Sequence, residues 1–274
     1  MIHSRLFTSL AVFLLLLVIA GGSSAAGAAS LTPTPGSTGW DVSYPQCGTK
    51  LPTRGSFAIV GVNDGRAYSL NPCLSGEYTW AVSRGTPALY MNTANPAPSS
   101  SYYWPTSGTY DPALCIDSTS TTDPGCAYDY GWHAATNALN AAVAAIGSVA
   151  GQIPWWLDVE TANSWNGDGI SNAADIQGSL DFLHSRGVPI VGVFSTNYQW
   201  SVITGGYTVT SAATYLAAWS AEFTPLVSLS SVQDWVAGAV TARVAAANCT
   251  AGFTGGPTLL AQYKSGKLDA DLAC

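Results

Sequence analysis

Short apolar runs alternate along this chain with segments whose apolar residues recur at a helical period. Runs of four to eight apolar or β-branched residues are typical of buried strands, and longer segments of period 3.6 are typical of helices. We expect strands within residues 39–45, 57–64, 87–96, 153–161, 188–196, 214–223 and 255–266. We expect helices within 76–85, 132–151 and 172–187, with Asn172 as a cap. Segment 228–248 is mixed and fits neither pattern clearly.

Strands that are apolar throughout and are separated by helices indicate a parallel sheet with both faces covered. About eight such units predict an α/β fold, a disulfide-stabilised (β/α)8 TIM-type barrel in a single domain. The alternative is a doubly wound open sheet, which usually carries a glycine-rich phosphate turn after its first strand. Here that position reads "DVSYPQCG", which does not fit G-x-G-x-x-G.

The first residues have the order of a secretory signal peptide. Arg5 precedes an apolar run over 6–20, and Ala26-Gly27-Ala28 fits a small-residue cleavage site. We therefore predict a signal peptide at 1–29, a flexible linker at 30–38, a barrel domain at 39–274, and secretion to the extracellular space. The alternative is an uncleaved anchor, but the run is shorter than the roughly 20 residues that span a bilayer.

Charge is scarce and acidic, since only 9% of the chain is Asp, Glu, Lys or Arg, and 16 acidic residues face nine basic ones. Nucleic-acid binding needs a basic face, and docking to anionic lipid needs basic clusters, so neither partner is expected. A polar, weakly charged surface instead suits a secreted monomer that meets uncharged or sugar-rich material such as cell-wall glycan.

Six cysteines follow the predicted leader, and an even count in an oxidising compartment favours disulfides. Their order along the chain suggests the pairs Cys47–Cys73, Cys115–Cys126 and Cys249–Cys274, and the alternative is that some thiols are free. No pair has zinc-type spacing, and histidine is too scarce for a His-rich site, so we expect no metal and no cofactor.

Two acids, Asp158 and Glu160, stand one residue apart in the apolar run "PWWLDVETANSW". Residues i and i+2 of a strand point to the same side, so Trp156, Asp158 and Glu160 should face the barrel axis while Leu157 and Val159 face the helices. Two adjacent, partly desolvated carboxyls raise one pKa, which glycoside hydrolysis requires of its general acid. A hydrogen-bonded structural pair or a metal-ligand pair is the alternative, because D-x-E is common by chance.

Several segments, taken in order, resemble the family 25 glycoside hydrolases, the Chalaropsis-type lysozymes, and in particular the secreted glycoside hydrolase-like proteins of actinobacteria. The similar segments are "GWDVSYPQC", "FAIVGVNDG", "WWLDVET", "VGVFSTNYQW", "AAWSAEFTP" and "LLAQYKSGKLDADLAC". The resemblance implies a lysozyme-like hydrolase that cleaves the β-1,4 bond after N-acetylmuramic acid in peptidoglycan, or a bond in a related N-acetylated polysaccharide.

The resemblance also implies residue roles. Glu160 would be the proton donor, and Asp158 would stabilise the positive centre or orient the N-acetyl group. Asp41 and Asp269, the latter matching better than Asp271, would complete an acidic floor. At the carboxyl ends of the strands, the expected substrate contacts are Tyr44, Asn63, Tyr90, Asn92, Trp156, Gln262 and Tyr263.

Three departures concern the substrate more than the fold. The family's Tyr-His-Phe on the third strand is Tyr90-Met91-Asn92 here, and its Trp before Gln-Tyr is Ala261. An insertion at 97–131 has no counterpart, and its stretch "SSSYYWPTSGTY" is either a sugar-contacting loop or a surface loop without function.

Each residue also has a plainer interpretation. Asp41 could cap a turn, Asp269 could be a surface charge, and Trp156 and Tyr263 could pack in the core. Trp235 lies in a helix-like segment and is expected to pack. Two other functions stay open: a non-catalytic barrel that binds cell-wall glycan, and a glycosidase of another specificity.

Overall fold

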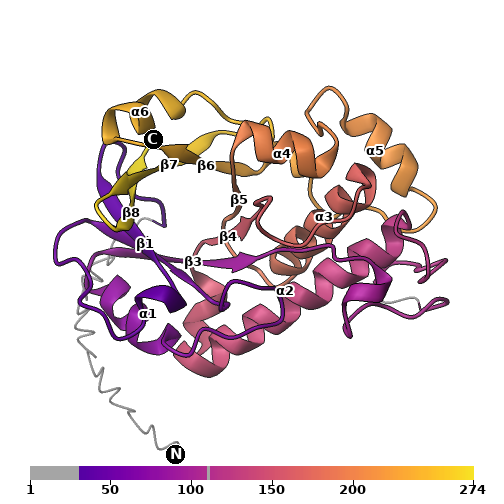
Figure 1. Ribbon diagram of the computed structural model, residues 1–274, viewed down its shortest axis with the longest axis horizontal. Helices are drawn as coiled ribbons and strands as arrows, with labels where there is room; N and C mark the ends of the chain where they lie inside the picture. Colours follow the sequence, from indigo (N-terminus) through magenta and orange to yellow (C-terminus); the bar gives the residue numbers. More distant parts are fainter. Residues whose placement is uncertain (1–30, 110–111) are drawn as a thin grey trace, which may run out of the picture.

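The computed structural model describes residues 31–109 and 112–274, so the predicted signal peptide lies outside the described residues. Eight strands form one closed barrel in the order β1 to β8 (Figure 1). They are β1 (Thr38–Val42), β2 (Phe57–Gly61), β3 (Thr86–Asn92), β4 (Trp155–Asp158), β5 (Val191–Ser195), β6 (Gln233–Ala239), β7 (Thr258–Ser265) and β8 (Leu268–Ala273). The expected closed eight-stranded barrel is confirmed.

Within the described residues, six α-helices and four 3₁₀ turns connect the strands. The α-helices are α1 (Leu74–Val82), α2 (Pro124–Ile146), α3 (Gly169–Ser185), α4 (Asn197–Thr204), α5 (Ala212–Trp219) and α6 (Ala242–Asn248). The 3₁₀ turns are η1 (Tyr44–Gln46), η2 (Pro98–Ser100), η3 (Ser148–Gln152) and η4 (Leu229–Ser231). Among the described residues, no helix is both long enough and apolar enough to cross a membrane.

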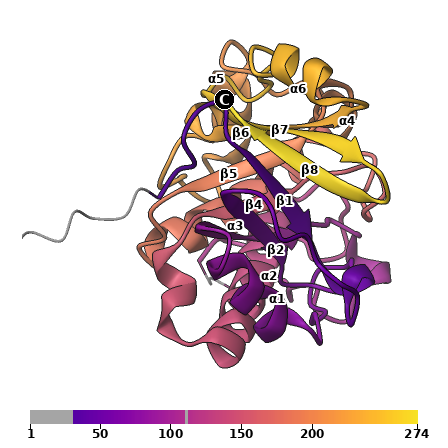
Figure 2. The same cartoon turned by 90° about the vertical axis from the view of Figure 1, so that its left-hand side faces the viewer.

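The barrel is mixed, which corrects the expected all-parallel (β/α)8 arrangement. Strands β1 to β7 pair in parallel, but β8 is antiparallel to both β7 and β1. Figure 2 shows the yellow β7–β8 hairpin beside the indigo β1. The hairpin turns at Gly266, whose φ of 68° suits glycine. A turn this short can join only antiparallel strands, so no helix lies between β7 and β8.

Three local expectations were wrong. Segment 214–223, expected as a strand, contains most of α5 because Tyr215, Trp219 and Phe223 recur every four residues and are buried on one face. Helix α2 begins at Pro124 with Asp123 as its cap, eight residues before the expected start at 132. Asp168, rather than Asn172, caps α3 by accepting from the Ser171 amide at 2.7 Å.

Two apolar layers hold the barrel together. Outward-facing strand residues such as Leu157 and Val159 pack against the helices, as expected. The inward residues of the lower barrel, including Phe57, Trp156 and Trp235, form a second cluster around the axis. This plug lies below the carboxyl ends of the parallel strands.

Helices α2 and α3 pack unusually close together on the outside of the barrel (Figure 1). A Cβ at Gly178 would lie 2.0 Å from the Tyr128 carbonyl oxygen, so only glycine allows the two backbones to approach this closely. The disulfides Cys47–Cys73, Cys115–Cys126 and Cys249–Cys274 confirm the pairing expected from chain order. The second of them ties the insertion to the first turn of α2.

Candidate active site

A polar cavity of about 220 Å³ lies at the carboxyl ends of the strands, above the apolar plug. Nine residues from β1 and from β3 to β8 line it: Asp41, Tyr90, Asp158, Glu160, Phe194, Trp235, Gln262, Lys264 and Asp269. The structure therefore brings together the four acids that the sequence singled out, from three strands and one loop. It also brings Tyr90 and Gln262, two of the expected substrate contacts, to the same place.

Asp158 is the deepest acid of the D-x-E pair and only 5% exposed. Its Oδ2 accepts a hydrogen bond from Asn92 Nδ2 at 2.5 Å, while Oδ1 has no hydrogen-bond partner among the described residues. Burial raises the pKa of Asp158 well above its usual range, the carboxylates of Glu160 and Asp41 raise it further, and the Asn92 bond opposes the rise. Asn92 is thus the group that favours a charge on Asp158.

Glu160 lies two residues after the end of β4, in the loop that follows it, and is half-buried at the cavity. Its main chain is fixed, because its carbonyl oxygen accepts from Trp165 Nε1 at 2.8 Å and from the Asn163 amide at 3.0 Å. Burial raises the pKa of the Glu160 carboxyl, a hydrogen bond from Gln199 opposes the rise, and Asp269 adds to it. A carboxyl that keeps its proton nearer neutral pH is suited to general-acid work.

The floor of the cavity is a second acidic group, on β1 and β8. Asp41 and Asp269 are direct partners across the antiparallel pair, and Asp271 lies two residues further along β8. Burial and the Asp269 charge raise the pKa of Asp41 to about 7, while a hydrogen bond from Gln262 Nε2, at 3.2 Å, opposes the rise. Lys264 Nζ forms an ion pair with Asp269 Oδ1 at 2.7 Å and supplies the local positive charge.

Asp271 belongs to this floor more closely than sequence comparison indicates. It is fully buried, and its Oδ1 accepts from Trp235 Nε1 at 2.8 Å. Burial, followed by the Asp41 charge, raises the pKa of Asp271 well above its usual range. It sits behind Asp41 and does not line the cavity, so it acts on the cavity through its neighbours.

Tyr90 is the neutral member of the site. Its ring packs edge-on against Trp235, with centroids 6.3 Å apart, and its pKa rises because of burial and then because of the Asp41 charge. The hydroxyl therefore stays protonated. A Cβ at Gly61 would lie 2.7 Å from the Tyr90 ring, so glycine at this position leaves room for the tyrosine.

Five of the seven expected substrate contacts do not line the cavity, and one of these, Asn92, touches it only through its hydrogen bond to Asp158. Trp156 is buried in the apolar plug, and Tyr263 packs outside the barrel beside Ala245 of α6. Asn63 is buried and bridges two loops, donating to the Ser69 carbonyl oxygen at 2.8 Å and accepting from the Asn92 amide at 3.0 Å. Tyr44 is exposed in η1, beside Gly65.

Lys264, Phe194 and Trp235 line the cavity but were absent from the expected contacts. Lys264 shares a face of β7 with Gln262, so the i, i+2 rule pointed to it. Trp235 lies on β6, not on a helix, and the correct strand assignment would have turned it inward. Phe194 carries no polar group that could draw attention to it in the sequence.

Metal ligation finds little support among the residues that the structure describes. The only close grouping there of three potential ligands is Cys115, Asp123 and Cys126. Both cysteines are joined in a disulfide and offer no thiolate. Asp123 is occupied as the cap of α2, accepting from the Cys126 amide at 2.8 Å.

An acidic cavity at the carboxyl ends of a closed barrel is typical of an enzyme acting on a polar substrate, and the carboxyl pair is typical of glycosidases. Comparisons with known proteins find lysozyme-like matches. A family model described as "Lysozyme-like protein 1" matches residues 133–225. A 53-residue stretch, 19% of this chain, is 43% identical to a "Probable GH family 25 lysozyme 4" of Dictyostelium discoideum, and it spans 24% of that protein's length.

Solved structures show the same fold at low identity. The bacterial lysozyme from Streptomyces coelicolor matches with a TM-score of 0.51 and 17% identity, over 88% of this chain and 93% of the other. The spore cortex lytic enzyme SleM of Clostridium perfringens matches with a TM-score of 0.54 and 10% identity, over 88% of this chain and 68% of the other. Part of this chain is therefore similar in sequence to lysozyme-like proteins and to a family 25 lysozyme, and its fold is similar to that of these two solved structures.

Proposed function

We propose that this protein is a secreted, lysozyme-like glycoside hydrolase that cleaves β-1,4 bonds in peptidoglycan or a related N-acetylated polysaccharide. The observation that carries the proposal is the convergence of Asp158, Glu160, Asp41 and Asp269 on one cavity at the carboxyl ends of the strands. The likeness to lysozymes supports the polymer class, and the weakly charged surface suits an extracellular glycan.

In this proposal Glu160 is the proton donor. Burial raises the pKa of both carboxyls, and the Glu160 charge raises that of Asp158 further. The mechanism requires the proton on Glu160 and the charge on Asp158, and the Asn92 hydrogen bond favours that charge. Glu160 then protonates the leaving glycosidic oxygen.

In this proposal Asp158 acts on the sugar ring that is being cleaved from the leaving oxygen. As carbon–oxygen cleavage proceeds, positive charge develops on the sugar ring, and a carboxylate held below it stabilises that charge or orients the neighbouring N-acetyl group. Asp41, with a pKa of about 7, holds a proton for part of the neutral range and can donate a hydrogen bond to the sugar. Gln262 and Tyr90 offer further polar contacts in the same cavity.

The test is a digest of purified bacterial peptidoglycan and of chitin-type oligomers with the wild type and with Glu160→Gln. New reducing ends are counted and the fragments are weighed by mass spectrometry. Asp168→Asn is the matched control, because it also replaces one carboxyl by an amide but keeps an N-cap on α3.

We expect the wild type and the control to release fragments and Glu160→Gln to lose at least a hundredfold in rate, in line with removal of a general acid. The fragment masses identify the bond. If the wild type releases nothing while both proteins sediment with the glycan, the protein is a binding barrel and the hydrolase proposal is wrong.

A further inference from the structure

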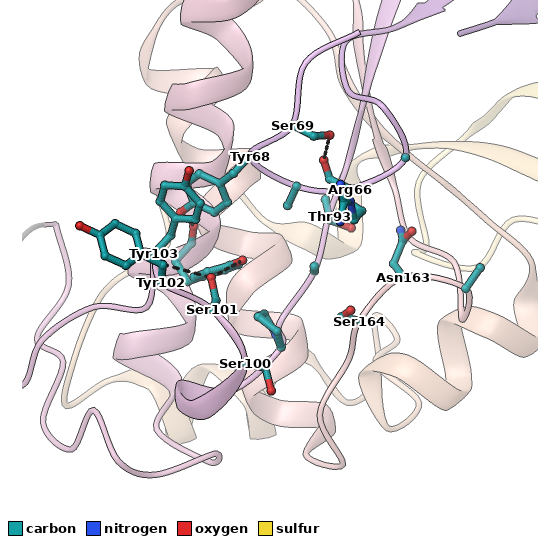
Figure 3. Close-up of a pocket in the computed structure, with 16 residues that line it drawn as sticks. Arg66, Tyr68, Ser69, Thr93, Ser100, Ser101, Tyr102, Tyr103, Asn163 and Ser164 are labelled. Carbon is teal, nitrogen blue, oxygen red and sulfur yellow. Dashed lines mark hydrogen bonds between the residues drawn. The ribbon is translucent and has the colours of Figure 1, made fainter. Parts of the chain in front are cut away.

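A second and larger cavity, of about 480 Å³, lies beside the acidic one and plays no part in the proposed chemistry. The loops that follow β2, β3 and β4 form it together with the start of the insertion and one residue of α2 (Figure 3). Tyr68 and Tyr103 lie on one side of it, and Asn163 and Ser164 approach from the other. The family resemblance assigns no role to this insertion.

Ring stacking and hydrogen bonds fix the aromatic side of this cavity. The rings of Tyr68 and Tyr103 stack in parallel, with centroids 4.0 Å apart. The Tyr68 hydroxyl donates to the Tyr130 carbonyl oxygen at 3.0 Å, and Ser101 Oγ donates to the Tyr130 hydroxyl at 3.2 Å. Tyr102, at the rim, is 97% exposed, and its ring meets the Tyr103 ring edge-on with centroids 5.7 Å apart.

The two cavities share a wall at the backbone of Asp158. The Asp158 carbonyl oxygen accepts from Thr93 Oγ1 at 2.6 Å and from Asn163 Nδ2 at 3.0 Å, and both donors line the larger cavity. The side chain of the same Asp158 lines the acidic cavity. The two cavities therefore lie close together, with the Asp158 main chain between them.

Backbone strain gathers in the same loops. Among the described residues, only Tyr68 and Ala97 of the non-glycine residues have a positive φ, 62° and 69°. Tyr68 lines the cavity, and Ala97 lies between Pro96, which lines it, and η2. Such conformations are strained, and they tend to cluster at functional sites where the surrounding structure holds them.

We propose that the larger cavity is an accessory subsite for a sugar ring of the same polymer, several residues from the bond that is cut. The inference rests on the proposed function. An exposed aromatic ring offers a flat apolar face to the axial C–H groups of a pyranose, and hydroxyl and amide side chains such as Thr93, Ser101 and Asn163 suit its hydroxyls. The aliphatic side chains of the lining are only alanines and one proline, with no Val, Leu, Ile or Met, which disfavours a lipid or a hydrophobic peptide.

The experiment measures binding of N-acetylglucosamine oligomers by calorimetry in a Glu160→Gln background, which prevents turnover. Two further variants carry Tyr102→Ala with Tyr103→Ala, or Tyr102→Phe with Tyr103→Phe. A third, Tyr198→Ala, removes another exposed tyrosine that lines neither cavity. The probes are the disaccharide, the hexasaccharide and a peptide-bearing muropeptide of matching glycan length.

We expect the double alanine variant to bind the hexasaccharide about threefold to tenfold more weakly, as loss of an aromatic contact implies, and to bind the disaccharide unchanged. The double phenylalanine and Tyr198→Ala variants should match the background. Unchanged hexasaccharide binding in the double alanine variant, with hydrolysis by the wild type intact, would overturn the subsite and leave the hydrolase proposal standing. Weakening confined to the muropeptide would overturn it in favour of a stem-peptide site. Absence of both binding and hydrolysis would overturn both proposals.

Discussion

Asn92 Nδ2 donates to Asp158 Oδ2 at 2.5 Å, and this hydrogen bond joins the end of β3 to the most buried acid of the cavity. The resemblance to family 25 lysozymes leads to the expectation of an aromatic residue at this position. Its amide compensates for part of the desolvation of Asp158, so this chain has a polar support for its acid that an aromatic ring could not give.

Replacing Asn92 by leucine should therefore shift the acid side of the pH–rate profile to higher pH. The variant keeps the branched shape of the side chain, with somewhat larger methyl groups, but removes the donor that opposes the raised pKa of Asp158. We expect the rate of peptidoglycan hydrolysis at pH 5 to fall about tenfold, since a lost hydrogen bond to a charged group is worth about 1.5–3 kcal/mol, and the loss at pH 8 to be smaller. Asn92→Asp does not serve as a control, because it adds another acid. An unshifted profile, with circular dichroism unchanged, would show that Asp158 need not be ionised.

Stability should fall as pH rises from about 4 to about 7. The pKa of Asp41 is about 7 in the folded protein against 3.8 ordinarily, so across this window the unfolded chain releases a proton that the folded protein keeps. The unfolded state then binds fewer protons, and the free energy of unfolding decreases with pH. Thermal melts between pH 4 and 8 test this, and Asp41→Asn should flatten the slope. A melting temperature that rises steadily across this window in the wild type would contradict the assignment.

Asp175 is a second, independent group that should make the free energy of unfolding decrease as pH rises. It lies on α3, is 1% exposed, and neither carboxylate oxygen has a hydrogen-bond partner among the described residues. Burial alone raises its pKa well above the usual range. Asp175→Asn has nearly the same shape and no charge, so we expect it to be more stable than the wild type by about 1–3 kcal/mol at pH 8 and by less at pH 5. Urea titrations at the two pH values measure the difference, and equal gains at both would argue against titration of this group.

Gly61→Ala should disturb the acidic cavity without unfolding the barrel. The added Cβ would lie 2.6 Å from Ser43 Cβ and 2.7 Å from the Tyr90 ring, so Tyr90 must move toward the acids. We expect the KM for peptidoglycan to rise by about threefold to tenfold and the stability to fall by about 1–3 kcal/mol, the usual cost of overpacking. Gly76→Ala, in α1 with open space around its Cβ position, is the control. Kinetics that match this control would mean that Tyr90 does not contact substrate.

The local sequence was enough to predict several features of the structure. The alternation in "WWLDVE" determines which side chains face the axis, because a strand has a period of two whatever surrounds it, and the structure agrees for Trp156, Leu157, Asp158 and Val159. The disulfide pairs also followed chain order, since each closes a short separation of 11 to 26 residues.

Other features depend on partners far away in the sequence, so only the tertiary structure decided them. β8 lies antiparallel because it closes the barrel between β7 and β1, and a turn of two residues leaves no room for a helical crossover. Strand alternation puts Gln262 and Lys264 on one face of β7 and Tyr263 on the other, but which face turns toward the barrel axis depends on how β7 pairs with β6 and β8. The larger cavity arises likewise, because Tyr68 and Tyr103 belong to separate loops that meet only once the barrel has closed.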